Sequence, residues 1–148
     1  MYEELRLRTE RHVAAGGRTP QVLLAEIGDA KMRAARSNFA ANFFACAGFE
    51  IATQRFKKAE EIAAVDADAI VLCSADGEYA ALAAELMPKL KALGRKTPMI
   101  VAGNPENAEE LRAAGIADLV HVRSQPVEFL TKWQKRLGIE EQPLASSY

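Results

Sequence analysis

Short apolar runs alternate with helical patterns along this chain, and this alternation limits its possible folds more than any other feature. Five runs are expected to be strands, at residues 22–27, 49–53, 69–73, 99–102 and 119–122. All but the weaker second run are mostly apolar and contain β-branched residues. Continuous apolarity is typical of strands that are covered on both faces, as in a parallel sheet between two layers of helices.

The segments between and after these runs have helical spacing. Helices are expected at residues 34–47, 59–65, 78–93, 107–114 and 126–137. In the third, leucines recur every three or four residues and lay one apolar stripe along the helix, which Gly94 then ends. Strict alternation of strands and helices predicts an α/β fold, a doubly wound five-stranded parallel sheet with the flavodoxin-like order 2-1-3-4-5.

The predicted sheet places three connecting segments on one rim. In this fold, ligands bind beyond the carboxyl ends of the strands, where the strand order reverses. The segments at that point are residues 28–33, 74–78 and 103–106. A ligand site, if the chain has one, is therefore expected there.

The length of 148 residues corresponds to about one domain. We expect the α/β unit at residues 20–138. Residues 1–19 are expected to form an N-terminal helix and a linker, and residues 139–148, which lack periodicity, a disordered tail.

Composition excludes several classes of partner. The chain has 19 basic and 20 acidic side chains and a formal charge of −1, so it shows no electrostatic footprint for nucleic acid. No apolar run approaches the roughly 18 residues of a membrane span, and the charged start is unlike a secretory signal. Cys46 and Cys73 lie in apolar segments, as reduced core thiols do, and we expect a cytoplasmic protein.

Three kinds of chemistry are poorly supported at the rim. A phosphoacceptor site needs an aspartate where the third strand ends, and Cys73 and Ser74 stand there, with Asp76 too late. The segment GDAKMR has a single glycine and cannot form a dinucleotide-binding turn. The histidines, His12 and His121, are not clustered with other ligands, so no metal site and no catalytic residue is expected.

The basic residues after Gly28 leave two interpretations open. Lys31, Arg33 and Arg36 near the start of a helix are able to attract an anion. Such a run is more often a solvated turn or a surface that faces a partner protein.

Several segments resemble a known family. GDAKMRAARSNFAANFFACAGFEI, AIVLCSADGEY and PMIVAGNPENAEELRAAGIADLVHV, together with the strand order, resemble the cobalamin (B12)-binding domain at the C-terminus of methylmalonyl-coenzyme A mutase. The resemblance covers about residues 20–138. It implies the same fold, and it implies that the N-terminal helix is the connection from a preceding barrel domain.

The cofactor motifs of that family are degenerate here. Family members that bind the cofactor carry DxHxxG after the first strand, SxL after the third and GG after the fourth. The position of the cobalt-ligating histidine is taken by Met32 or Arg33, depending on a one-residue gap. Ser74 and Gly103 match the serine and the first glycine, which line the slot for the nucleotide tail. The resemblance thus predicts Met32, Arg33, Ser74 and Gly103 as a degenerate cofactor-binding site.

Residues 36–44, RSNFAANFF, resemble the small, non-catalytic subunit of heterodimeric mutases. The resemblance implies a chain that supports the B12-dependent interconversion of methylmalonyl-CoA and succinyl-CoA by structure and assembly. Its partner would be the large catalytic subunit or the preceding barrel domain. Adenosylcobalamin would belong to the complex and not to this chain.

Two further points remain open. Phe39, Phe43 and Phe44 either fill the family's cofactor groove or belong to the ordinary helix core. One alternative function is a working cobalamin domain with base-on or unusual cobalt ligation. The other is a receiver-like signalling domain without a phosphoacceptor.

Overall fold

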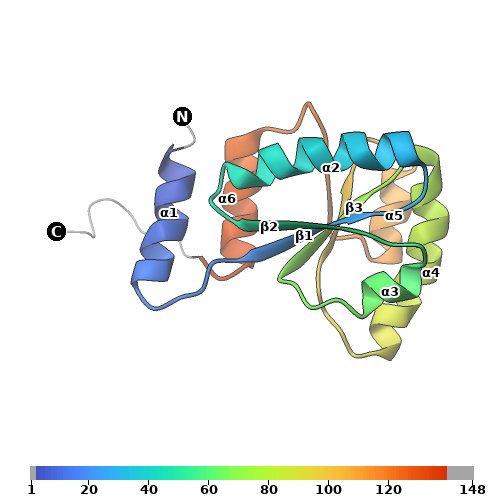
Figure 1. Cartoon of the computed structure of the whole chain (residues 1–148), viewed down its shortest axis with the longest axis horizontal. Coiled ribbons are helices and arrows are strands. Elements are labelled where there is room, and N and C mark those ends of the chain that lie inside the picture. The colour runs from blue at the N-terminus through green and yellow to red at the C-terminus, as the bar shows by residue number, and fades with distance from the viewer. Residues whose placement is uncertain (1–2, 140–148) are drawn as a thin grey trace.

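A five-stranded sheet forms the centre of the molecule, in a computed structural model that describes residues 3–139 (Figure 1). The strands are β1 (Gln21–Glu26), β2 (Glu50–Arg55), β3 (Ala69–Cys73), β4 (Met99–Ala102) and β5 (Asp118–Val120). They lie in the order β2-β1-β3-β4-β5, and every neighbouring pair is parallel. The predicted fold class and strand order are confirmed.

Helices cover both faces of this sheet. They are α1 (Glu3–Ala14), α2 (Ala30–Ala45), α3 (Ala59–Ala63), α4 (Tyr79–Ala92), α5 (Ala108–Ala114) and α6 (Pro126–Arg136), with a 3₁₀ turn at Asp76–Glu78. Residues of α2 and α6 pack on one face, and residues of α3, α4 and α5 on the other. Continuous apolarity in the central strands follows from this double cover, and all of β3 and β4 is buried.

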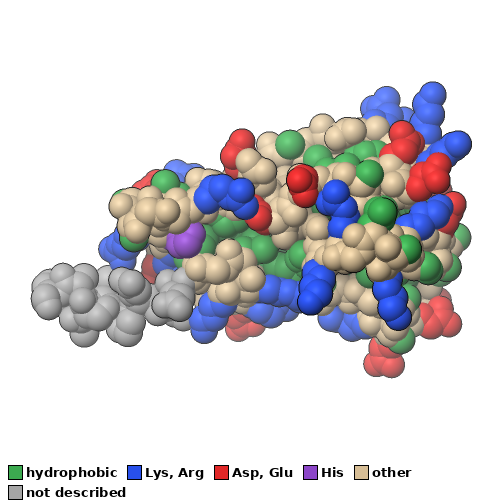
Figure 2. All heavy atoms as spheres, turned by 90° about the horizontal axis from the view of Figure 1, so that it is seen from below, with side chains coloured by type: hydrophobic (Ala, Val, Ile, Leu, Met, Phe, Trp, Pro, Cys, Tyr) green, Lys and Arg blue, Asp and Glu red, His purple; other side chains and the backbone are tan. Residues whose placement is uncertain are grey.

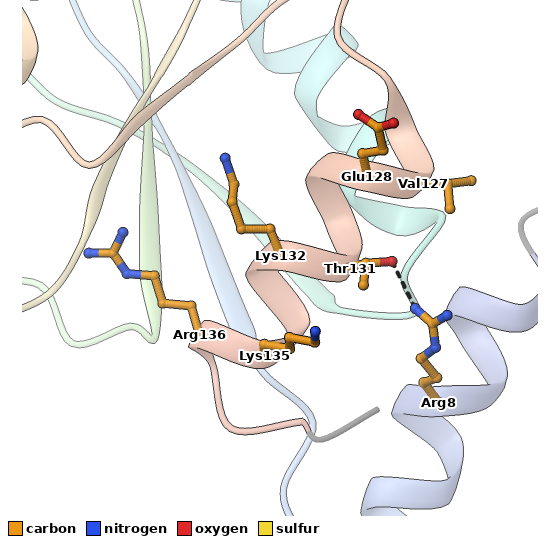
Figure 3. A pocket seen from close by; sticks show the side chains of 7 residues that line it. All are labelled: Arg8, Val127, Glu128, Thr131, Lys132, Lys135 and Arg136. Carbon is orange, nitrogen blue, oxygen red and sulfur yellow. Dashed lines mark hydrogen bonds between the residues drawn. The ribbon is translucent and has the colours of Figure 1, made fainter. Parts of the chain in front are cut away.

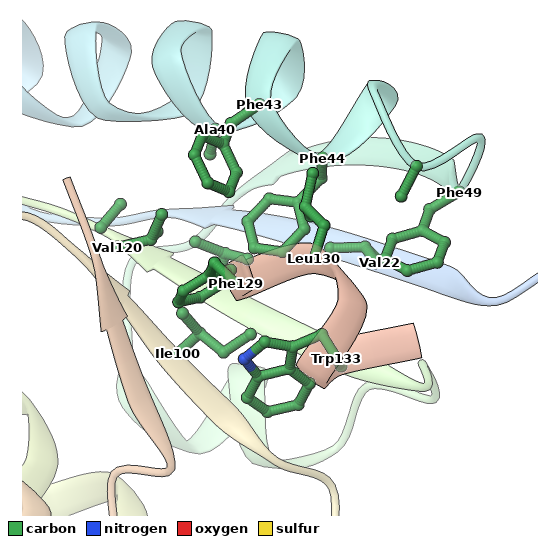
Figure 4. Packing of buried hydrophobic residues seen from close by; sticks show 14 of the residues in the cluster. Val22, Ala40, Phe43, Phe44, Phe49, Ile100, Val120, Phe129, Leu130 and Trp133 are labelled. Atoms are coloured by element: carbon green, nitrogen blue, oxygen red, sulfur yellow. The ribbon is translucent and has the colours of Figure 1, made fainter. Parts of the chain in front are cut away.

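Aromatic rings join α2 to α6 above the first face. Figure 4 shows Phe43 and Phe44 of α2 pointing toward Phe129 and Trp133 of α6. The ring centroids of Phe43 and Phe129 are 5.5 Å apart at 82°, an edge-to-face arrangement that adds to the area burial. This contact fixes α2 over the strands whose ends form the rim.

The helix α2 begins four residues earlier than its apolar spacing predicts, at Ala30 and not at residue 34. Asp29 is its N-cap, and the Asp29 carboxylate accepts a hydrogen bond from the backbone N–H of Met32 at 2.9 Å. An N-cap aspartate satisfies one of the free N–H groups of the first turn. Most of the expected rim loop at 28–33 is therefore helix.

The helix α1 packs against the face that α2 and α6 cover, through buried polar contacts. Thr9 donates its hydroxyl to the carbonyl of Ala47 at 2.6 Å, and the Gln134 amide donates to the Leu5 carbonyl at 2.7 Å. Leu5 is 1% exposed. The predicted division at residues 19 and 138 stays a prediction, but α1 shares a core with the α/β unit.

The end of the chain was expected to be a tail from residue 139. Ile139 is buried in the core beneath α2 and α6. Residues 140–148 lie outside the described residues.

The surface carries both signs of charge. Figure 2 shows one face, on which Lys and Arg side chains lie in separate groups among acidic and apolar ones. Within residues 3–139, no helix is long and apolar enough to cross a membrane.

Candidate functional site

The carboxyl ends of β1, β3 and β4 form the rim at which a ligand site was expected. The register pairs Glu26 of β1 with Cys73 of β3, and Cys73 with Ala102 of β4. The residues that follow these strand ends therefore meet. They include Ser74 and Gly103, two of the four predicted site residues.

Tyr79 lies between the ends of β3 and β4 and joins them. Its hydroxyl accepts a hydrogen bond from the Ser74 N–H at 2.9 Å and lies 2.5 Å from the Ala102 carbonyl oxygen. The carbonyl oxygens of Leu72 and Ser74 are 3.1 and 3.0 Å away. The side chain is 1% exposed, and burial raises the pKa of the Tyr79 hydroxyl above its ordinary value of 10. The neutral hydroxyl holds two strand ends at a fixed spacing.

An ion pair lies above Gly103. The Arg36 guanidinium, from α2, donates to the Asp76 carboxylate at 2.8 Å. Gly103 has φ +150°, and a Cβ there would lie 2.4 Å from Asp76 Oδ1, 3.3 Å from Tyr79 Cε2 and 3.4 Å from Arg36 Cζ. Side chains of this chain therefore occupy the space directly against the Gly103 backbone.

A second close approach occurs at Gly28, two residues after the end of β1. The Asp29 N–H donates to the Glu78 carboxylate at 3.0 Å. Gly28 has φ +83°, and a Cβ there would lie 2.4 Å from Glu78 Oε2 and 2.7 Å from Ser74 Oγ. Glu78 thus closes the rim between β1 and β3.

The other two predicted site residues lie in the first turn of α2. Met32 is held through its backbone N–H by Asp29, and Arg33 donates to the Gly28 carbonyl at 2.9 Å. The groups nearest Gly103 come instead from Asp76, Tyr79 and Arg36. The structure brings Ser74 and Gly103 together and places Met32 and Arg33 on the flank.

His121 follows β5 and serves the turn that leads to α6. Its ring Nδ1 accepts from the Arg123 N–H at 3.2 Å, and its own N–H donates to the Ser124 hydroxyl at 3.0 Å. The histidine acts as a polar cap of this turn.

The phenylalanines of α2 belong to the ordinary core. Phe43 and Phe44 pack on Phe129 with centroid distances of 5.5 and 6.0 Å, and the half-buried Phe39 packs on Phe43 at 5.5 Å. At the strand ends, the space is filled by Arg36, Asp76 and Tyr79, which the sequence reasoning did not single out together. A tyrosine six residues after a buried strand was a usable sequence signal for a buried hydroxyl, and the Arg36–Asp76 ion pair had no such signal.

Glu26 and Cys73 lie inside the rim, below the ion pair. The Ser37 hydroxyl donates to the Glu26 carboxylate, and Arg55 approaches that carboxylate at 3.7 Å. Burial, reinforced by the negative charge of Glu26 and opposed by Arg36, raises the pKa of the Cys73 thiol to about 12. Cys73 is thus a neutral thiol and a poor nucleophile.

The difference in burial between Cys46 and Cys73 predicts selective labelling of the two cysteines. Iodoacetamide at neutral pH is expected to modify the half-buried Cys46 in the folded chain and to spare Cys73, which is 0% exposed and protonated. Peptide mass spectrometry before and after unfolding in urea measures both sites. Equal labelling of the two thiols in the folded chain would contradict the buried rim.

Two open hollows are also present among the described residues, and the first borders this network at Asp76. One of about 560 Å³ is lined by Asp76, Gly77, Asn104, Pro105, Glu106 and Asn107. The other, of about 760 Å³, lies between α1 and α6 (Figure 3), where Arg8 donates to Thr131 at 2.8 Å. In this second hollow Lys132 hydrogen-bonds Asp118, and Arg136 stacks over Trp133 at 4.7 Å. Among residues 3–139, no three His, Cys, Asp or Glu side chains are grouped to hold a metal ion.

Comparisons with known proteins agree with the fold and indicate a relationship. The chain is 40% identical over 143 residues to the methylmalonyl-CoA mutase small subunit of Porphyromonas gingivalis, covering 93% of this chain and 22% of that protein. It is 34% identical over 143 residues to the small subunit of Streptomyces virginiae, with the same coverage. The chain therefore spans about a fifth of the length of the curated relatives that it matches. No protein-family model matches the chain.

Among solved structures, a CheY-like protein from Pseudomonas aeruginosa PAO1 superposes with a TM-score of 0.58. The sequence identity is 16%, and the match covers 84% of this chain and 98% of that protein. At this identity the likeness shows the fold alone. It agrees with the flavodoxin-like strand order.

Proposed function

We propose that this chain, which is related to methylmalonyl-CoA mutase small subunits over nearly its whole length, is the cobalamin-binding-like domain of such a subunit. In this proposal it supports the B12-dependent interconversion of methylmalonyl-CoA and succinyl-CoA by structure and subunit assembly. Its partner is the large catalytic subunit or a preceding barrel domain. The chain itself contributes no catalytic residue and no cobalt ligand.

The occupied space against Gly103 is the observation that carries this proposal. The residues there do not fit a corrinoid. Met32 and Arg33 offer no imidazole, and Asp76, Tyr79 and Arg36 occupy the space against Gly103. Many polar groups at the strand ends are hydrogen-bonded within the chain, while among the described residues Arg33 Nε and Arg36 Nε are buried without a partner.

Such a domain contributes by holding the segments connected to it in a fixed orientation. Two buried layers hold the sheet, and α1 is fixed to the turn after α2 and to α6 through Thr9, Leu5 and Gln134. A segment connected through α1 is therefore held in a defined orientation relative to the sheet. Fixed orientation is what a structural module supplies to a larger enzyme.

A cobalamin titration tests the proposal. The purified chain is titrated with hydroxocobalamin, followed by absorption spectroscopy, and then passed over a gel-filtration column. We expect an unchanged spectrum and separation of the colour from the protein. Horse-heart myoglobin with haem serves as a positive control for co-elution of a coloured cofactor.

A shifted spectrum with co-elution would overturn the proposal and favour the alternative of a working cobalamin domain. Loss of the shift on substituting Met32, Arg33 or His121 would then identify an unusual ligand. Retention of the shift in all three variants would point to base-on binding.

The assembly role has a test of its own. The large mutase subunit is co-expressed with a small subunit that carries this domain, and separately with one that lacks residues 20–139. We expect a stable heterodimer with the first and a weakened or absent one with the second. Equal yields of heterodimer would contradict a role in assembly.

A further inference from the structure

We infer that Arg36, Asp76 and Tyr79 form an internal plug at the rim, and that this plug, in addition to the missing histidine, keeps a corrinoid out. The inference rests on the proposed function, in which the chain does not bind cobalamin. It assigns the exclusion to occupied space as well as to a lost ligand. The two causes make different predictions.

The ion pair is the upper part of the plug. It connects the second turn of α2 to the 3₁₀ turn after β3 through the 2.8 Å contact between Arg36 and Asp76. The side chains are only 23% and 40% exposed, so the pair is partly shielded from solvent. A charged hydrogen bond that spans two elements resists the separation of α2 from the sheet edge.

Tyr79 is the lower part. Its buried hydroxyl is shared among backbone groups of Leu72, Ser74 and Ala102, so the ends of β3 and β4 cannot part without losing these bonds. Its ring edge lies 3.3 Å from the Cβ position of Gly103. The backbone of Gly103 is thus enclosed from two sides, and even one added methyl group meets Asp76 at 2.4 Å.

If only the histidine had been lost, an open slot would remain and a restored histidine would recover corrinoid binding. If a plug also fills the slot, restoring the histidine alone would not recover binding. If the space is occupied, then a histidine at position 32 or 33 gains little corrinoid binding until the ion pair is removed. The increase in corrinoid affinity on removing the ion pair measures how strongly the plug excludes the corrinoid.

The experiment compares variants in hydroxocobalamin titrations followed by absorption and gel filtration. Met32→His and Arg33→His are made separately, each alone and each together with Arg36→Ala/Asp76→Ala. The matched control adds Glu85→Ala/Lys89→Ala, which removes an exposed ion pair of α4 at 3.5 Å, to the same histidine variants. We expect at least one histidine variant to bind at least about tenfold more tightly once the Arg36–Asp76 ion pair of the plug is removed, and no gain with the control pair.

Two results would overturn the inference. One is a histidine variant that already binds hydroxocobalamin with the ion pair in place and gains nothing when the pair is removed. The other is the absence of any gain in both histidine variants that lack the ion pair. If circular dichroism shows that the double alanine variant is unfolded, Asp76→Ser replaces it with the same expectation, because Asp76 lies on a partly exposed turn. Binding by the unmodified chain would instead overturn the proposed function, so the two failures are distinguishable.

Discussion

Replacing Gly103 by alanine is expected to lower the free energy of unfolding by about 2–3 kcal/mol, through backbone strain and overpacking together. A φ of +150° strains any residue with a Cβ, and this Cβ would lie 2.4 Å from Asp76 Oδ1. Asp76 Oδ1 has to move, which weakens its 2.8 Å contact with Arg36. Urea denaturation followed by circular dichroism measures the change.

Gly94→Ala is the matched control for this substitution. Gly94 has φ +67° and no atom within 4 Å of its Cβ position, so only the backbone contributes. Its cost is expected to be about 1–2 kcal/mol. Equal costs at the two glycines would show that the space above Gly103 is open, which would contradict the packed rim.

Asp118→Asn is expected to destabilise the chain by about 2–3 kcal/mol at neutral pH, because several hydrogen bonds to a buried carboxylate are weakened at once. Asp118 begins β5 and is 4% exposed. It accepts from the Trp133 indole at 3.0 Å and the Leu119 N–H at 2.9 Å, and it also contacts Lys132 and Arg112. The asparagine variant is measured beside Asp66→Asn, an exposed aspartate that is expected to change little.

The contribution of Asp118 to the free energy of unfolding depends on pH. Burial raises the pKa of this carboxyl, but the hydrogen bonds from Lys132, Trp133 and Leu119 outweigh burial, so the pKa in the folded chain lies below 3.8. A depressed pKa contributes stability that is fully present above the unfolded value and is lost as pH falls through the folded value. The difference between the native chain and Asp118→Asn should therefore be constant above about pH 5 and shrink below pH 3.8. A difference that grows on acidification would contradict this assignment.

Parts of the rim could be predicted from the sequence. Ser74 and Gly103 were predicted to lie near each other, and the register of β3 and β4 brings them together. The site assignment itself stays a prediction, since no ligand contact tests it. The start of α2 was misplaced by four residues, because apolar spacing says nothing about a polar first turn that is capped by Asp29.

The amino-acid sequence by itself determined the fold class. Continuous apolar strands and striped helices can be buried only in a sheet with helices on both faces, so local pattern is sufficient. The degeneracy of the cofactor motifs is likewise a matter of residue identity, as at the position of the cobalt-ligating histidine, which Met32 or Arg33 occupies. Neither conclusion requires interatomic distances from the tertiary structure.

Only the tertiary structure decided what fills the rim. Arg36, Asp76, Tyr79 and Gly103 are up to 67 positions apart along the chain, from 36 to 103, and they meet because three strands end at one edge. The same holds for Asp118, whose partners come from α5, α6 and its own strand. Contacts of this kind depend on the packing of elements that are distant in the sequence, and no periodicity in a single segment encodes them.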